Sequence, residues 1–172
     1  MAAPYISEKS FIARLAIGNT KYPGPVGRWE YRPGYNGTKR WQLGGWLTTS
    51  RQDREPQTLW FGAVKKGDGY AYEIRLWTGD RAHAMYNQRV DISTNDYLGL
   101  YELTSAVGPL WKLDYDSAAQ ARLTTLEGKA VGVRYDKAFW TSGLIGSYLQ
   151  VGRAPAAEFD VEIVQMGVDE PR

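Results

Sequence analysis

The sequence predicts a mostly β, single-domain fold: an antiparallel β-barrel or β-sandwich with one or two short helices. Three aromatic segments between Lys39 and Thr78 alternate apolar with polar or cationic side chains, and polar turns join them. Successive side chains of a strand point to opposite faces, so a period of two is typical of half-buried strands. Glycine and proline punctuate the remaining apolar segments, as they do in barrels and sandwiches. We expect one β-rich domain over residues 1–172.

The elements before this region follow from local composition. Residues 1–9 are predicted to form a flexible arm, and a first strand is predicted over 11–17, where apolar side chains occupy alternate positions. The stretch 18–27 is rich in glycine and proline, which excludes regular structure. A short strand is then expected over 28–32 and a turn over 33–37, where Asn and Gly suit left-handed backbone.

The segment from Lys39 to Thr78 is predicted to be a three-stranded meander and is the main candidate for function. In each strand one set of alternate positions is apolar and suits a core, whereas the other set is a mixture of cations and indoles. A soluble protein rarely exposes several indoles without a use for them, so this outer face predicts a binding surface. A bulge at Gly44-Gly45 or at Gly62 would turn a neighbouring tryptophan inward. The outer face comprises Arg40, Trp46, Trp60, Lys66, Arg75 and Trp77.

Two short helices are predicted in the second half of the chain. Thr78, Gly79 and Asp80 can cap a helix over 81–90. Asp116 or Ser117 can cap a second helix over 117–123. Between the two helices the composition of 97–103 is β-like and that of 108–116 is ambiguous.

The last part of the chain is predicted to be β again. Strand-like segments occupy 126–140, 143–152 and 158–166, and a polar tail follows over 167–172. Val131, Val133 and Tyr135 would share one face of the first of these strands, because they stand at alternate positions.

Catalytic chemistry has few candidate residues in this sequence. There is no cysteine, which excludes disulfides, thiolate metal sites and cysteine nucleophiles. The single histidine, His83, lies between two alanines without a partner at metal-ligand spacing. Acidic pairs such as Asp114 and Asp116 are typical of the solvated side of amphipathic segments. We therefore predict a non-enzymatic protein with no metal and no cofactor.

Location and membrane association are predicted from absences in the sequence. The first residues lack a basic start followed by a long apolar run, so no signal peptide is expected. No apolar stretch approaches the roughly 20 residues of a membrane helix, so no membrane partner is expected. Together with the lack of cysteine, these features favour a cytoplasmic protein.

Cations and aromatic residues are interleaved along the chain, and this pattern favours nucleic acid. Single-stranded nucleic acid is bound by cations that follow its phosphates and by aromatic rings that stack on its bases. The net charge of +2 permits an anionic partner without requiring one. A second basic-aromatic stretch over 134–140 could complete a groove. The predicted binding residues are Arg40, Trp46, Trp60, Lys66, Arg75, Trp77, Arg134 and Trp140.

The order of these segments resembles that of OB-fold single-stranded DNA-binding proteins of the phage type. A strand ending in YEIRLWTGD precedes the predicted helix RAHAMYNQRV, and LEGKAVGVRYD and AEFDVEIVQM resemble the last two strands of that family. The resemblance covers 11–18, 40–90 and 126–166 and implies an OB-like barrel that binds single strands with little sequence preference. It leaves 91–125 without a counterpart, and the end of the chain, GVDEPR, is not the acidic tail of such replication proteins.

Two alternatives use the same exposed aromatic residues. A lectin-like β-barrel or sandwich would stack them on the apolar face of a sugar ring. A structural protein, for example a virion component, would bury them in an interface between subunits. A homo-oligomer is expected in either the nucleic-acid or the assembly interpretation.

Overall fold

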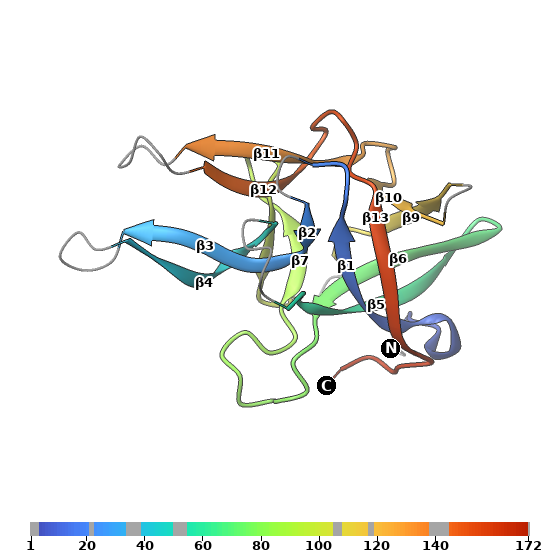
Figure 1. Ribbon diagram of the computed structural model, residues 1–172. Helices are drawn as coiled ribbons and strands as arrows, with labels where there is room; N and C mark the ends of the chain where they lie inside the picture. The colour runs from blue at the N-terminus through green and yellow to red at the C-terminus, as the bar shows by residue number, and fades with distance from the viewer. Residues whose placement is uncertain are drawn as a thin grey trace.

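A computed structural model of the chain confirms the mostly β fold, with one 3₁₀ turn, η1 (Ser7–Lys9), and antiparallel strands (Figure 1). None of the helices in the described residues is long and apolar enough to cross a membrane. The structure describes residues 4–20, 23–33, 39–49, 55–104, 108–116, 119–137 and 145–171. The strands are β1 (Phe11–Ile17), β2 (Gly24–Pro25), β3 (Gly27–Pro33), β4 (Lys39–Thr48), β5 (Thr58–Lys66), β6 (Gly69–Leu76), β7 (Arg89–Ile92), β8 (Leu98–Tyr101), β9 (Trp111–Tyr115), β10 (Ala121–Thr125), β11 (Val131–Lys137), β12 (Ile145–Val151) and β13 (Phe159–Met166).

Six of the strands pair in a closed ring. Going round it, β1 is followed by β5, β6, β9, β10 and β13, and β13 pairs with β1 again. The ring therefore follows chain order, as in up-and-down barrels, whereas an OB-fold is a five-stranded Greek-key barrel. Two pairings in the ring are narrow joints, each made by a single residue pair. Strand β6 pairs with β9 at Tyr72 opposite Trp111, and β10 pairs with β13 at Ala121 opposite Phe159.

The other strands form an extension of the same sheet. β4 pairs with β3, β8 and β12, and β7 connects β8 to β6 of the ring. In Figure 1 the β3–β4 and β11–β12 pairs point away from the ring toward the left. The predicted three-stranded meander is therefore wrong in one respect: β5 and β6 are neighbours, but β8 and β7 separate β4 from β6. Alternation of side chains specifies the two faces of a strand but not which strands lie next to it. The long connection over 49–57 does not require β4 and β5 to pair with each other.

Neither predicted helix forms in the described residues. Residues 81–88 are turns, in which Ala82 N donates to Asp80 Oδ1, and Asn87 has a left-handed φ of 60°. The next residues belong to β7. An isolated helix of this length is marginal without an apolar face to pack, so turn chemistry prevails. In the second segment, residues from Ala121 onward form β10 and pair with β9.

The main core lies inside the ring and continues beneath β7, β8, β11 and β12. Alternate residues of β1, including Phe11 and Leu15, meet Phe61 of β5 and Phe159 of β13 there. A second, small cluster lies on the outer face of the ring and contains Ile12, Trp60 and Val168, with Tyr5 and Trp77 packed against it. Strand β5 is therefore buried on both of its faces.

The described part of the predicted arm, residues 4–9, is hydrogen-bonded to β5 and to Ser10, the residue before β1. Ile6 N donates to Ala63 O at 2.9 Å, and Ser10 Oγ donates to Ile6 O at 2.8 Å. In the same place Ala63 N donates to Ser10 Oγ at 2.9 Å. These bonds fix the segment that carries Tyr5.

Candidate functional site

The predicted outer face of β5 and β6 is covered by both ends of the chain. Trp60, expected to be exposed, is fully buried: Tyr5 packs edge-on against its ring at a centroid distance of 5.1 Å. Its Nε1 donates to Val168 O at 3.0 Å. Trp77 is half-buried against the same cluster. The prediction of an exposed face here is wrong because segments more than 50 residues away in sequence complete a second core.

Beside Trp60 lies a buried network of charges centred on Glu73. This carboxylate accepts hydrogen bonds from Arg75 Nε at 2.9 Å, from Arg89 at 3.3 Å and from Gly108 N at 3.0 Å, and also from the Tyr5 hydroxyl. Arg75, predicted to contact phosphate, is only 4% exposed. Its charge is already matched by Glu73 and Glu170, so it is not available for a phosphate.

The pKa shifts in this network favour fixed charges. Burial alone would raise the pKa of Glu73, but hydrogen bonds from Tyr5 and Gly108 and the charge of Arg75 outweigh it and hold the pKa below 4.5. Burial, followed by the neighbouring Glu73 carboxylate, raises the pKa of the Tyr5 hydroxyl far above its ordinary value. Tyr5 therefore stays a neutral donor and Glu73 stays an anion, which is the behaviour of a structural network and not of an acid–base pair.

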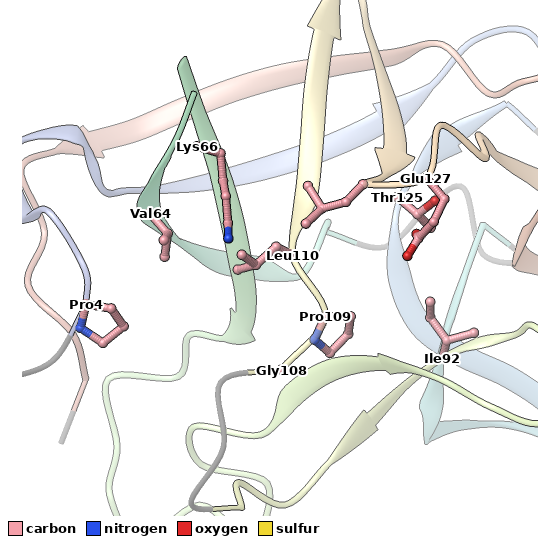
Figure 2. A pocket seen from close by; sticks show the side chains of 10 residues that line it. Pro4, Val64, Lys66, Ile92, Gly108, Pro109, Leu110, Thr125 and Glu127 are labelled. Carbon is pink, nitrogen blue, oxygen red and sulfur yellow. The ribbon is translucent and has the colours of Figure 1, made fainter. Parts of the chain in front are cut away.

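Lys66 lies elsewhere, at the edge of a cavity of about 510 Å³ (Figure 2). The walls are mostly apolar and come from β5, the end of β7, the residues before β9 and the turn after β10. The charged groups of Lys66 and Glu127 have no hydrogen-bond or ion-pair partner among the described residues. Such a cavity has the size and lining of a small-molecule site and could hold an apolar group with a charged end. Its lining residues are Pro4, Val64, Lys66, Ile92, Gly108, Pro109, Leu110, Thr125, Leu126 and Glu127.

The β3–β4 pair carries a different concentration of aromatic and basic residues. Its register sets Trp29 opposite Leu43, Tyr31 opposite Trp41 and Arg32 opposite Arg40. Lys39 is the next residue along β4, opposite Pro33. Trp29 and Trp41 are half-buried, and Leu43 is 53% exposed although alternation placed it in the core. Adjacent pairs of a ladder point to opposite faces, so Arg32 and Arg40 lie on the face opposite to that of Tyr31 and Trp41. We call the residues of the two faces together the β3–β4 surface: Trp29, Tyr31, Arg32, Lys39, Arg40, Trp41 and Leu43.

Trp46 belongs to an aromatic cluster at the base of this pair. Its ring lies over Gly99 of β8 and meets Tyr97 edge-on at 6.0 Å, and Tyr97 meets Tyr148 in the same way at 5.9 Å. The Tyr148 hydroxyl donates to Glu30 at 3.1 Å. The register of β3 and β4 shifts between Trp29 and Gly27, opposite the Gly44-Gly45 step where the sequence suggested a bulge. Trp46 is half-buried as a result.

The structure thus divides the predicted binding residues between two parts of the molecule. Trp60 and Trp77 belong to the outer cluster of the ring, Arg75 to the charge network beside it, and Lys66 to the cavity. Arg40 and Trp46 lie on β4, and Arg134 lies opposite Tyr148 on the neighbouring β11–β12 pair. Trp140 lies outside the described residues. His83, expected on a helix, lies in a turn where its Nδ1 accepts from Met85 N.

Most members of the charge network around Glu73 and Arg75 have no signal in the sequence. Glu73 and Arg75 stand two apart on one strand, so their shared face could have been read from the spacing. Arg89, Glu170 and Tyr5 come from distant segments and carry no local signal. Among the described residues no group of three or more His, Asp or Glu side chains could hold a metal ion.

Comparison of the chain with protein-family models, with curated proteins and with solved structures gave no match.

Proposed function

We propose that the protein binds single-stranded nucleic acid on the β3–β4 surface, without catalysis. The observation that carries this proposal is the β3–β4 register, which gives each face of the pair one kind of residue. Trp29–Leu43, Tyr31–Trp41 and Pro33–Lys39 are the pairs of one face, and Arg32 and Arg40 are direct cross-strand neighbours on the other. Like charges directly opposite each other destabilise a sheet. An anion between the two arginines removes that cost, and a phosphate of a nucleic acid supplies one.

The aromatic residues of the β3–β4 surface support the same ligand. Stacking of one base on an aromatic side chain contributes about 1–3 kcal/mol and is tolerant of sequence. Trp29 and Trp41 are half-buried, so each ring keeps part of its area open to solvent. Arg134 adds a cation on the β11–β12 pair, which adjoins β4 through the Tyr148–Thr48 pairing.

The test is a titration of the protein with oligo(dT), followed by tryptophan fluorescence at about 50 mM and about 200 mM salt. We expect quenching and an affinity that falls steeply with salt, because bound phosphates release counterions. The R32A/R40A double variant should bind more weakly, and its salt slope should be smaller by about 0.7 for each cation removed. The W41A variant should lose about 5- to 150-fold in affinity with an unchanged salt slope, the equivalent of one stacked base.

The matched control is R122A/R153A, which removes the same charge from β10 and from the residues after β12. Arg122 has a side chain that is 59% exposed and only a 3.9 Å ion pair with Glu158, so its loss should leave folding intact. If both double variants weaken the binding of oligo(dT) equally, the effect comes from overall charge, and the β3–β4 surface is rejected as the binding site. Absence of quenching at the lower salt would reject nucleic acid, and quenching by sugars instead would support the lectin-like alternative.

A further inference from the structure

Strand β13 leaves one edge of the ring open. It pairs with β1 along its length, but on its other side β10 meets it only at Phe159. Among the described residues nothing else pairs with β13 between Val161 and Met166. In Figure 1, β13 runs down the front of the molecule beside β1, and β9 and β10 lie near its upper end.

The open part of β13 is exposed, with mostly apolar residues on its inner face and polar residues on its outer face. Ile163, Val164 and Met166 are 46%, 44% and 50% exposed, and Glu162 and Gln165 between them are exposed as well. An exposed apolar strand with free backbone groups is a template for pairing with another strand. Natural edges are protected by lysine and other charged residues, by proline and by bulges. Neither lysine nor proline occurs between Phe159 and Met166, where the protecting features are Asp160, Glu162 and a bulge at Val164.

The pattern of apolar and polar residues along this edge is the same when it is read in either direction. From Val161 to Met166 the chain reads apolar, polar, apolar, apolar, polar, apolar. We propose that two copies of the chain pair through this edge, antiparallel, about a two-fold axis between Ile163 and Val164. Val161 then lies opposite the partner's Met166, Glu162 opposite the partner's Gln165, and Ile163 opposite the partner's Val164.

A bulge in β13 makes this pairing geometrically consistent. A two-fold axis perpendicular to a sheet keeps every residue on its own face. Paired residues must share a face, so in two regular strands the numbers of two paired residues are both odd or both even, and their sum is even. In the proposed register the numbers of two paired residues add up to an odd number, so regular strands could not adopt it. The pairing of β1 with β13 skips Val164, because Ile12 lies opposite Gln165 and Ala13 opposite Ile163.

The skipped residue shifts the faces of β13 by one position. Val161, Ile163 and Met166 lie opposite the core-facing residues Leu15, Ala13 and Phe11, whereas Glu162 and Gln165 lie opposite Arg14 and Ile12 on the other face. In the proposed register apolar residues therefore meet apolar residues on the inner face, and Glu162 meets Gln165 on the outer face. The extra residue of each copy, Val164, lies opposite Ile163 of the other copy, and both strands have a bulge at the same place.

A second copy fits this edge better than an unrelated strand for three reasons. The polarity pattern is complementary to itself at all six positions. No like charges oppose each other, because Glu162 faces an amide and not a second carboxylate. A closed two-fold pair also covers the edge in both copies at once.

Sedimentation equilibrium and light scattering on the full chain test the proposal. We expect the wild type to reach twice the chain mass of 19.4 kDa as concentration rises. I163K/V164K should be monomeric, because it sets two lysines against two lysines across the axis. I163K/V164E should dimerise again, because it sets opposite charges across the axis at both positions.

The control is L103K/L126K, which makes the same change at two leucines that are 39% and 41% exposed elsewhere. It should dimerise like the wild type, and circular dichroism checks that each variant is folded. A wild type that stays monomeric at high concentration, or dimerises equally well as I163K/V164K, would overturn the proposal. So would a failure of I163K/V164E to restore the dimer lost in I163K/V164K.

Discussion

At the scale of single residues, Glu73 connects several separate segments of the chain. It lies on β6 and is fully buried, and its partners come from the first residues of the chain, from β6 itself, from β7 and from the residues before β9. Removing one member of a buried ion pair costs about 3–5 kcal/mol, because the remaining charge loses its compensation. Glu73 compensates two arginines, so its charge is a main determinant of stability.

We expect the E73Q variant to lose about 3–5 kcal/mol of unfolding free energy at pH 7, measured by urea denaturation. The pKa of Glu73 is depressed in the folded state, so its stabilisation is complete above the unfolded value and is lost as pH falls through the folded value. The difference between wild type and E73Q should therefore shrink below about pH 4.5. E102Q, which changes an exposed glutamate, should differ by less than about 0.5 kcal/mol. A constant difference down to acid pH would contradict this role.

At the scale of elements, β5 shows how one strand is buried on two faces. Its core-facing residues Leu59 and Phe61 join the main core, while the ring of Trp60 lies across Gly62, two residues further along the same face. A Cβ at Gly62 would stand 2.1 Å from an atom of that ring. The glycine therefore provides the space in which the tryptophan lies flat beneath Val168 and Tyr5.

The G62A variant tests this packing against G69A in the adjacent strand. We expect G62A to lose about 1–3 kcal/mol, since the indole must shift in a close-packed cluster. At Gly69 a Cβ meets nothing within 4 Å, so G69A should be neutral or slightly stabilising through the unfolded chain. Urea denaturation of the two variants gives the comparison. Equal stabilities would mean that Trp60 is free to move and that the outer cluster is loosely packed.

At the scale of the whole molecule, the ring and the projecting strand pairs differ in burial. β1 and β5 are buried along most of their length, and β6 lies between β5 and the narrow joint to β9. The β3–β4 pair has half-buried aromatic residues and an exposed leucine. Regions with fewer buried apolar contacts open at lower free energy than the core does.

Amide hydrogen exchange measured by NMR should resolve this difference. We expect the amides of β1 and β5 to exchange slowest, with protection near the global free energy of unfolding. Amides of residues 29–33 and 39–43 should exchange faster, through openings that leave the ring intact. Equal protection in both regions would instead mean that the β3–β4 pair and the ring unfold as one unit.

The sequence alone was enough to predict a β-rich fold and many of its strands. Strands β1, β5, β6 and β13 were predicted because their side chains alternate, and alternation depends only on local geometry. The helix expected over 81–90 failed because short helices depend on tertiary packing, which local propensity does not supply. An irregularity at Gly44-Gly45 could be predicted from the sequence because glycine tolerates bulges.

The tertiary structure decided which of the alternating faces are open. Trp60 and Arg75 have the same local pattern as exposed recognition residues, yet Tyr5, Val168 and Glu170 cover them. Burial of an outward face requires chain from elsewhere, and nothing within β5 or β6 specifies it. The sequence by itself determined the strands and the supply of aromatic and basic residues. Only the pairing of distant segments determined that Trp60 and Arg75 on the outer face of β5 and β6 are buried, whereas Trp29 and Trp41 of the β3–β4 pair are half-buried.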